Sequence, residues 1–233
     1  MFKRYLLGFT TFLTLSGFSL VSSNCDQIIF FKEGSYVKMT SYDDDGKEVG
    51  STKTVYHKVS KLNTGAEVMA SQESYDKKGK LLTQSDYKIR CENGTLYFDM
   101  KMMLPQQQAD AFKDFEMSVE GGDKEIPSEM TPGSTMKDVD IKFSFKTKDG
   151  MVMPMSTVTI KITNRKIESK ESITTPAGTF DCFKLSENYE TKTIFSIKGK
   201  TISWFCPEVG MVKSESYKEN GKFTGRTELT ELK

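Results

Sequence analysis

The sequence predicts an all-β protein, a single antiparallel meander that forms a curved sheet or barrel with one inserted helix. Two observations support this prediction. Apolar and polar residues alternate with a period of two over most of the chain, as in strands with one buried face. Short turn sequences that contain glycine separate these segments, as at the tips of β-hairpins. No linker-like or low-complexity stretch interrupts the pattern, so residues 24–233 are predicted to form one domain.

Eight segments show the strand pattern clearly. In chain order they are residues 51–60, 66–75, 81–90, 94–102, 139–147, 156–167, 193–205 and 225–232. The turn signals are DDDGK at 43–47, NTG at 63–65, DKKGK at 76–80, ENG at 92–94, TKDG at 147–150, IKGK at 197–200 and KENGK at 218–222. Short strands at hairpin spacing favour an antiparallel sandwich or barrel.

One segment breaks the strand pattern. Pro105 suits the first turn of a helix, and a glycine pair at 121–122 supplies a stop signal. Apolar residues between these signals follow approximately helical spacing, at Leu104, Phe112, Phe115 and Val119. The sequence therefore predicts a helix over about 105–119. It would cover one end of the barrel or form a movable lid over a cavity.

Three turn segments repeat one pattern, in which a tyrosine precedes a Gly-Lys pair by four residues. The tyrosines are Tyr42, Tyr75 and Tyr217, and the lysines are Lys47, Lys80 and Lys222. In the first copy the intervening acids Asp43, Asp44 and Asp45 resemble a calcium loop, because hard cations prefer several oxygen ligands around a tight bend. The second and third copies replace most of these acids. The repeat therefore predicts three equivalent hairpin tips rather than a calcium site.

The first 23 residues have the organisation of a secretory signal peptide. Two basic residues at positions 3 and 4 precede an apolar run to about position 20, and this pattern predicts cleavage before Asn24. Acylation of Cys25 is the alternative, disfavoured because Asn24 stands where a small residue is normally required. No second apolar stretch could span a bilayer. We expect an exported protein of the periplasm or outer cell surface, soluble or peripheral.

Four cysteines remain after position 24, and export to an oxidising compartment favours two disulfides. Cys182 and Cys206 lie in strand-like segments that are close in sequence, which favours their pairing with each other. Cys25 would then pair with Cys91. Zinc is the rival interpretation, but there is no C-x-x-C spacing and only one histidine. We expect no metal and no cofactor.

Known catalytic patterns are missing from this sequence. His57, the only histidine, alternates in phase with Val55 and Val59, which predicts an inward-facing structural residue. There is no G-x-S-x-G motif, and the glycine-containing turns precede strands rather than helices, unlike phosphate-binding loops. The 33 basic and 32 acidic residues balance, which argues against nucleic acid as a partner. We predict no catalytic residues.

Methionines and phenylalanines are the residues most suggestive of binding. The predicted apolar binding set is Met100, Met102, Phe112, Phe115, Met151, Met153 and Met155. Flexible, polarisable methionine side chains fill irregular cores, or line adaptable apolar cavities and partner surfaces. The M-x-M spacing is also suited to Cu(I), although no ligand-rich loop accompanies it. Core filling, an apolar cavity or partner surface, and copper binding all remain open.

The C-terminal third resembles a known family. The strings TTPAGTFDCFKL at 174–185 and WFCPEVGMVKSESYKENGKFTGRTELTEL at 204–232 are similar to the TapB-like family of exported bacterial proteins, common in Bacteroidetes and of unknown function. The segment IPSEMTPGSTMKDVDIKF also looks like that family. The resemblance implies a curved, barrel-like β domain in the cell envelope, and it offers no catalytic motif to transfer.

These observations predict a non-enzymatic periplasmic or cell-surface β-barrel that binds a lipid, another apolar ligand or an envelope protein. One alternative is a hydrolase that uses clustered carboxylates inside the barrel. The other is a Cu(I)-binding protein that uses methionine side chains.

Overall fold

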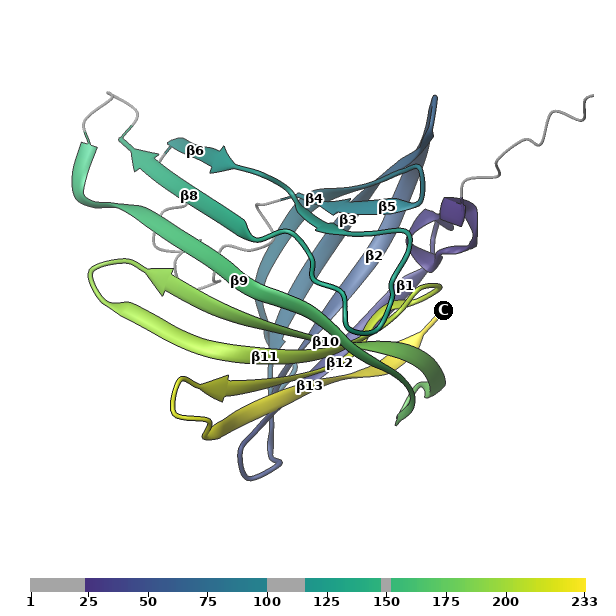
Figure 1. Cartoon of the computed structure of the whole chain (residues 1–233). Coiled ribbons are helices and arrows are strands. Elements are labelled where there is room, and N and C mark those ends of the chain that lie inside the picture. The colour runs from purple at the N-terminus through teal and green to yellow at the C-terminus, as the bar shows by residue number, and fades with distance from the viewer. Residues whose placement is uncertain (1–23, 100–115, 148–151) are drawn as a thin grey trace, which may run out of the picture.

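The computed structural model describes residues 24–99, 116–147 and 152–233, and for residues 152–156 only the backbone. It contains one antiparallel sheet of 13 strands, preceded by two short 3-10 helices (Figure 1). The 3-10 helices are η1 (Asn24–Gln27) and η2 (Ile29–Phe31). The strands are β1 (Tyr36–Asp43), β2 (Glu48–Leu62), β3 (Gly65–Asp76), β4 (Leu81–Glu92), β5 (Thr95–Phe98), β6 (Glu116–Gly121), β7 (Lys124–Ile126), β8 (Val139–Lys146), β9 (Val152–Thr175), β10 (Gly178–Lys192), β11 (Ser196–Cys206), β12 (Gly210–Lys218) and β13 (Phe223–Leu232).

The predicted fold class is confirmed, with one correction to the predicted helix. Residues 116–119 are not helical, because they belong to β6 and pair with β8. Val119 lies opposite Phe143 and packs against the core formed by β8 and β9, so strand pairing partly buries its apolar side chain. The rest of the predicted helix, 105–115, lies outside the described residues.

Alternation of apolar and polar residues explains the strands where it is regular. In β8, Val139, Ile141, Phe143 and Phe145 are buried, and the residues between them are exposed or partly exposed. Because successive side chains of a strand point to opposite faces, one face of the sheet carries the core and the other faces water. Full burial of each such side chain contributes about 1.5–3 kcal/mol to folding.

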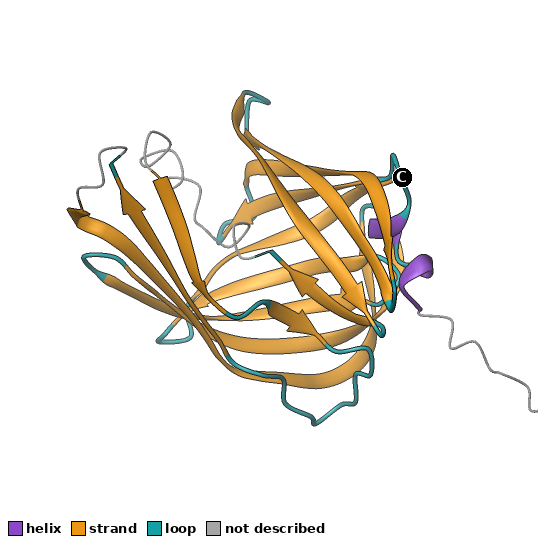
Figure 2. Ribbon diagram, turned by 90° about the horizontal axis from the view of Figure 1, so that it is seen from above, coloured by secondary structure: helices purple, strands orange, loops and turns teal. Residues whose placement is uncertain are grey.

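The two edge strands of the sheet follow one another in the chain. The strand order runs from β6 through β8–β13 and β1–β5 to β7, and only residues 122–123 separate β6 from β7. One chain segment therefore pairs with β8 over its first half and with β5 over its second half. The sheet is strongly curved into an open barrel, from which β6, β8 and the start of β9 extend to one side (Figure 2).

The predicted three-fold repeat is confirmed as three equivalent hairpin tips. The backbone N–H groups of Asp43, Asp76 and Lys218 donate to the carbonyls four residues ahead, at 2.9–3.0 Å. The tip glycines at 46, 79 and 221 have φ between 78° and 82°, a conformation that glycine adopts without a Cβ penalty. The Asp43 carboxylate accepts the backbone N–H groups of Asp45 and Lys47, so it closes the turn itself.

One predicted turn is wrong. The IKGK signal at 197–200 lies inside β11, and the tip between β10 and β11 is instead at 193–195. A Cβ on Gly199 would lie 2.5 Å from the Tyr189 hydroxyl oxygen and 2.4 Å from the Tyr217 carbonyl oxygen. Gly199 is therefore required by close packing inside the strand rather than by a turn.

The N-terminal 3-10 segment packs on the largest core of the molecule. Phe30 and Phe31 are buried with inward-facing side chains of β2–β5, among them Tyr56, Val68 and Ile89. The predicted disulfide between Cys25 and Cys91 is present and ties this segment to β4. The N-terminal segment therefore belongs to the folded domain, at the end of the barrel that also holds the C-terminus.

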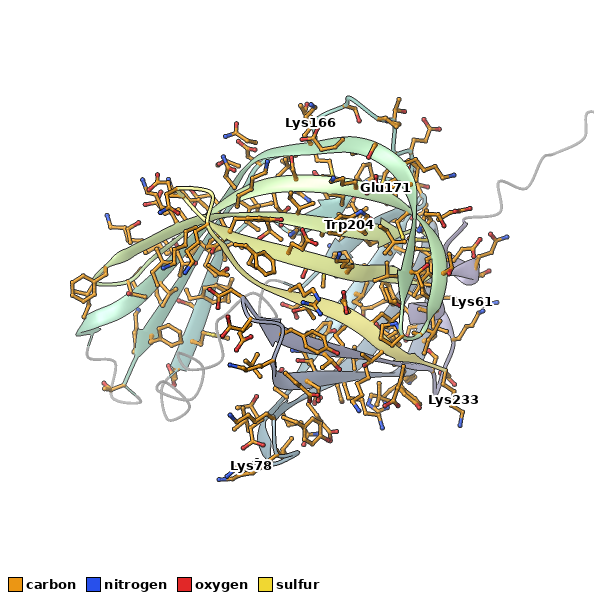
Figure 3. The ribbon with its side chains drawn as sticks, turned by 90° about the horizontal axis from the view of Figure 1, so that it is seen from below. Lys61, Lys78, Lys166, Glu171, Trp204 and Lys233 are labelled. Atoms are coloured by element: carbon orange, nitrogen blue, oxygen red, sulfur yellow. A yellow bond between two sulfur atoms is a disulfide. The ribbon has the colours of Figure 1, made fainter. Side chains whose placement is uncertain are left out.

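The hairpins divide between two ends of the barrel. The N-terminal end carries the 3-10 helices and the turns after β2, β4 and β11; Figure 3 shows Lys61 and Lys233 there. The opposite end, called the hairpin end below, carries the three repeated tips and the β10–β11 tip. Lys78, on the β3–β4 tip, marks it in the same figure.

Candidate functional site

The predicted apolar binding set lies largely outside the described residues. Met100, Met102, Phe112, Phe115 and Met151 are outside the described ranges. Two further members, Met153 and Met155, belong to β9, for which only the backbone is described at these positions. Their role as a binding set therefore stays a prediction.

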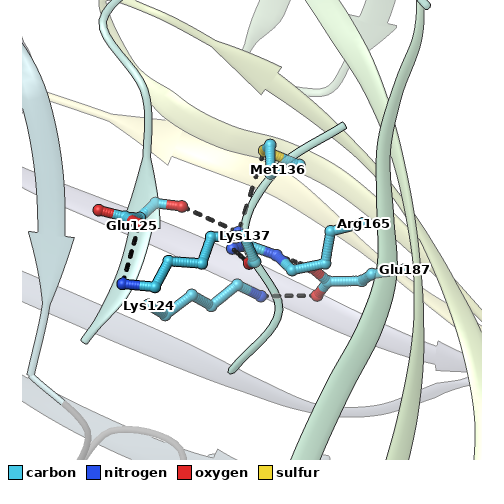
Figure 4. Close-up of polar contacts among 6 residues, drawn as sticks. All are labelled: Lys124, Glu125, Met136, Lys137, Arg165 and Glu187. Atoms are coloured by element: carbon cyan, nitrogen blue, oxygen red, sulfur yellow. Dashed lines mark hydrogen bonds and ion pairs between the residues drawn. The ribbon is translucent and has the colours of Figure 1, made fainter. Parts of the chain in front are cut away.

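A buried ionic cluster joins four parts of the chain inside the barrel (Figure 4). The Arg165 side chain on β9 is completely buried, and its guanidinium Nε donates to Glu187 Oε2 on β10 at 3.3 Å. The two terminal nitrogens donate to the backbone carbonyls of Lys137 and Glu125, at 2.7 and 2.9 Å. Lys124 Nζ lies 2.6 Å from Glu187 Oε1. Both carboxylate oxygens of Glu187 are thus occupied.

The electrostatics of this cluster favour an ionised Glu187. Burial by itself would raise the pKa of this carboxyl, but the charges and hydrogen bonds of Lys124 and Arg165 outweigh it and lower the pKa below its usual value. A carboxylate with both oxygens engaged and a lowered pKa is a poor general base. The cluster therefore anchors strand β7 and the segment before β8 to β9 and β10.

Strict alternation along β9 would place Arg165 on the outward face. Ile160 and Ile162 face the core at even positions, whereas Ile167 faces it at an odd position. The change of phase is a β-bulge at Asn164, which has φ of 52° and shifts the register between β9 and β10. Arg165 was not among the predicted site residues; the phase change between the isoleucines is the signal in the sequence from which this inward arginine could have been found.

The prediction that His57 faces inward is wrong. His57 is exposed, because its neighbour Tyr56 takes the inward position on β2 and the register shifts between Tyr56 and Val59. Its Nε2 lies 2.9 Å from Ser71 Oγ, which donates to Asp86 Oδ1 at 2.6 Å. In this hydrogen-bonded series Ser71 lies in the middle, and its hydroxyl donates a hydrogen bond to Asp86. His57 is therefore not placed as a base for Ser71, unlike in a catalytic triad.

A second apolar cluster holds the other two cysteines. Cys182 and Cys206 are buried with Trp204 where the β9–β10 hairpin folds over the end of β11–β13, and Ala177 N–H donates to Leu229 O at 3.3 Å. The predicted disulfide between them is absent, because both are free thiols in the structure. They are nevertheless neighbours, since they flank the paired residues Phe183 and Phe205 and their thiols share a hydrogen bond.

Hydrogen bonding between the two thiols polarises the pair. The hydrogen bond with the Cys182 thiol, together with the backbone N–H groups of Glu208 and Val209, outweighs burial and lowers the pKa of Cys206 to about 6. The same hydrogen bond, with burial, raises the pKa of Cys182. Trp204 donates through its indole N–H to Glu171, visible in Figure 3, and is covered by Lys184 and Lys213.

Exposed apolar side chains gather at the hairpin end. Large apolar residues with more than a third of their surface exposed occur there at Val49, Leu81, Leu82, Met117, Ile194, Phe195 and Ile197, and elsewhere in the described residues at Leu62, Met69 and Met211. We call the first group the apolar rim. The β10–β11 tip is its most exposed part: Ile194 is 60%, Phe195 76% and Ile197 63% exposed.

A basic groove of about 570 Å³ lies beside this tip, across β9–β12. Its walls follow two cross-strand rows on the sheet face opposite the core. One row is Thr163, Asn188, Lys200 and Tyr217, and the other is Lys161, Glu190 and Lys198. The Tyr217 hydroxyl donates to Glu215 at 2.6 Å, which raises the tyrosine pKa to about 12. The groove therefore presents four lysines, at 161, 198, 200 and 218, two acids, Glu190 and Glu219, and neutral hydrogen-bonding groups.

Residues suited to a metal ion do not converge in the described ranges, where no group of three or more His, Cys, Asp or Glu side chains has the required arrangement. Asp44 and Asp45, from the acidic turn, form ion pairs with Lys222 and Lys47 at 3.3 Å. Within the residues that the structure describes, no helix is long and apolar enough to cross a bilayer.

The fold defines an open-barrel β protein, and comparison identifies its family. The chain belongs to the DUF3108-like family, which matches residues 32–229. The TapB-like name suggested by the C-terminal strings is not confirmed. No curated protein matches this sequence.

Two solved structures share the fold over most of their length. One is a Parabacteroides distasonis protein described as a lipoprotein, with 27% identity and a TM-score of 0.70, covering 88% of this chain and 99% of that chain. The other is a Bacteroides fragilis protein described as exported and as having a YmcC-like fold, with 24% identity and a TM-score of 0.71. It covers 87% of this chain and 96% of that chain.

Proposed function

We propose that this protein is a non-enzymatic binding protein of the cell envelope, and that the apolar rim at the hairpin end is its binding surface. Its occupant is an apolar ligand or an envelope protein partner. The observation that carries the proposal is the exposure of Ile194, Phe195 and Ile197 on one tip. Contiguous exposed apolar side chains on a soluble domain mark interaction sites.

Export of this chain is supported from two sides. Residues 1–23 have the pattern of a signal peptide. The Parabacteroides distasonis relative, at 27% identity, is described as a lipoprotein. The Cys25–Cys91 disulfide fits an oxidising compartment as well.

The polar groups of the barrel support a binding role over catalysis. Glu187 has both oxygens engaged by Lys124 and Arg165. The Ser71 hydroxyl donates to Asp86 rather than to His57. The contacts of these groups stabilise the sheet. The apolar rim and the basic groove are therefore the described surfaces that we consider for binding.

Site-specific photo-crosslinking in the native envelope tests the proposal. A photoreactive phenylalanine analogue at position 195 is expected to give a discrete lipid or protein adduct on irradiation, identified by mass spectrometry. The same analogue at Leu62, which is 39% exposed at the N-terminal end, is the matched control. If position 195 gives no more adduct than position 62, the hairpin end is not the binding surface.

A further inference from the structure

The β10–β11 tip holds its apolar side chains outward on a rigid turn. Thr193 N–H donates to Phe195 O at 3.0 Å, and the Thr193 hydroxyl donates to the same oxygen at 3.4 Å. These bonds close the turn through the Phe195 carbonyl oxygen. Ile194 and Phe195 therefore form an apolar tip in which the Thr193 N–H group, the Thr193 hydroxyl and the Phe195 carbonyl are already paired when the tip enters an apolar phase.

Four lysines surround the base of this tip. They are Lys192, Lys198, Lys200 and Lys218, which we call the lysine collar; none forms an ion pair with another described residue. Three of them line the basic groove, at 198, 200 and 218. Two acids line the same groove, Glu190 and Glu219. Glu190 accepts a hydrogen bond from Ser196 at 2.6 Å, and the charges of Lys198, Lys161 and Lys192 also lower its pKa. The four collar lysines outnumber these two acids, which leaves net positive charge for an external anion.

We propose that the β10–β11 tip inserts into the interface of an anionic phospholipid bilayer, with the lysine collar on the lipid phosphates. This inference rests on the proposed function and specifies its occupant. The structure supplies the two parts that interfacial anchoring requires, an apolar wedge and a ring of cations behind it.

The spacing of the two parts suits a bilayer interface. Lys192 and Lys198 each lie three residues from Phe195 along the strands, which corresponds to about 10 Å at roughly 3.3 Å per residue. Interfacial segments bury their apolar side chains about 5–10 Å into the boundary between headgroups and acyl chains. With Phe195 at that depth, the two lysines reach the level of the phosphates, where long side chains extend toward the charged groups.

Charge also fixes which part of the hairpin end contacts the membrane. The β1–β2 tip carries three consecutive acids, Asp43, Asp44 and Asp45, which an anionic surface would repel. The β10–β11 tip and the end of β12 carry the lysine collar, whereas the β12–β13 tip also holds Glu219 and Lys222, which pairs with Asp44. The contact is therefore centred on the β10–β11 tip.

Vesicle sedimentation of the exported protein tests the inference. Vesicles of 30% phosphatidylglycerol in phosphatidylcholine are expected to bind the protein, and vesicles of pure phosphatidylcholine to bind it much more weakly. Replacing Phe195 by serine is expected to reduce binding at least about tenfold. The double substitution Lys192→Gln and Lys198→Gln is expected to reduce it by about fivefold per lysine. Leu62→Ser and Lys61→Gln, at the N-terminal end, are the matched controls.

Tryptophan fluorescence reports insertion directly. Trp204 is buried, so Phe195→Trp adds one exposed indole whose emission is expected to shift to shorter wavelength with the anionic vesicles. Leu62→Trp is expected to show no shift. All variants replace exposed side chains, and unchanged thermal unfolding checks that they fold.

Three results would overturn the inference. Binding that is equal for both lipid compositions, or unaffected at Phe195→Ser, excludes the bilayer contact. Loss of a dimer on Phe195→Ser, without vesicle binding, assigns the tip to a second copy of this chain. A protein adduct at position 195 without vesicle binding leaves the proposed function intact and excludes the lipid surface as its partner.

Discussion

Arg165 and Glu187 show how a single pair of residues positions several strands. The Arg165 side chain has no exposed surface, and its charge is compensated by one carboxylate and two backbone carbonyls. Removing one member of a buried pair leaves the other charge uncompensated, which costs about 3–5 kcal/mol. Because Lys124 shares the carboxylate, Glu187 is the member whose loss leaves most charge unpaired.

The protonation of Glu187 predicts acid-dependent stability. Its folded pKa is lowered, so its contribution is complete above the unfolded value of about 4.3 and is lost as pH falls through the folded pKa. Urea unfolding at pH 7, 5, 4 and 3 is expected to show Glu187→Gln less stable at pH 7, with the difference shrinking at low pH. Glu120→Gln, which removes an exposed pair with Lys142, is the control. A difference that stays constant with pH would contradict this role.

At the level of elements, β10 and β11 bring the remaining two cysteines together. Cys182 and Cys206 directly flank the last pair of the ladder, Phe183 and Phe205, and their thiols share a hydrogen bond. Residues opposite one another in antiparallel strands have Cα atoms about 4.5–5.5 Å apart. That spacing lies within the range that disulfides require. A covalent bond here would lock the end of the β10–β11 pair beneath the β9–β10 hairpin.

We expect Cys182 and Cys206 to form a disulfide when the protein is treated with oxidised glutathione. A Cys206 thiolate attacks oxidised glutathione, and Cys182 then displaces glutathione from the mixed disulfide, so two electrons pass to the oxidant and two reduced glutathione molecules leave. The expected product is 2 Da lighter, with a Cys182–Cys206 peptide in non-reducing mapping. Cys206→Ser is expected to show no such loss. Persistence of both free thiols after oxidation would contradict the pairing.

At the scale of the whole molecule, the Cys25–Cys91 disulfide attaches the N-terminal segment to the barrel. It closes a loop between positions 66 residues apart, and chain entropy for such a loop gives about 4 kcal/mol of stabilisation. Phe30 and Phe31 then pack on β2–β5 at the N-terminal end. The binding surface that we propose lies at the other end.

This arrangement predicts a large loss of stability when the disulfide is removed. The double substitution Cys25→Ala and Cys91→Ala is expected to lower the free energy of unfolding by about 4 kcal/mol. Calorimetry and urea unfolding of the exported protein measure the change, with Cys182→Ala as the control for an unbonded cysteine. Equal stability of the double variant and the wild type would show that packing of Phe30 and Phe31 alone holds the segment.

Local pattern was sufficient for some features of this protein. The three tips led by Tyr42, Tyr75 and Tyr217 follow from the repeated Tyr…Gly-Lys pattern, in which glycine supplies the positive φ of a tight hairpin turn. Alternation predicted the all-β class and the inward apolar residues of β8. The Cys25–Cys91 pairing was predicted by elimination, after Cys182 and Cys206 were expected to pair with each other; the first disulfide is present, although the second pair is free in the structure.

Other features depended on long-range packing. The bulge at Asn164 turned Arg165 inward, and pairing with β8 made residues 116–119 a strand. The barrel also brought tips far apart in sequence to one end, so that Ile194 and Phe195 became part of an apolar rim. The sequence by itself determined the strand class, the repeated turns and the signs of export, because these depend on neighbouring residues. Only the tertiary structure decided which side chains share a face or an end, because register shifts and sheet curvature depend on strands distant in the chain.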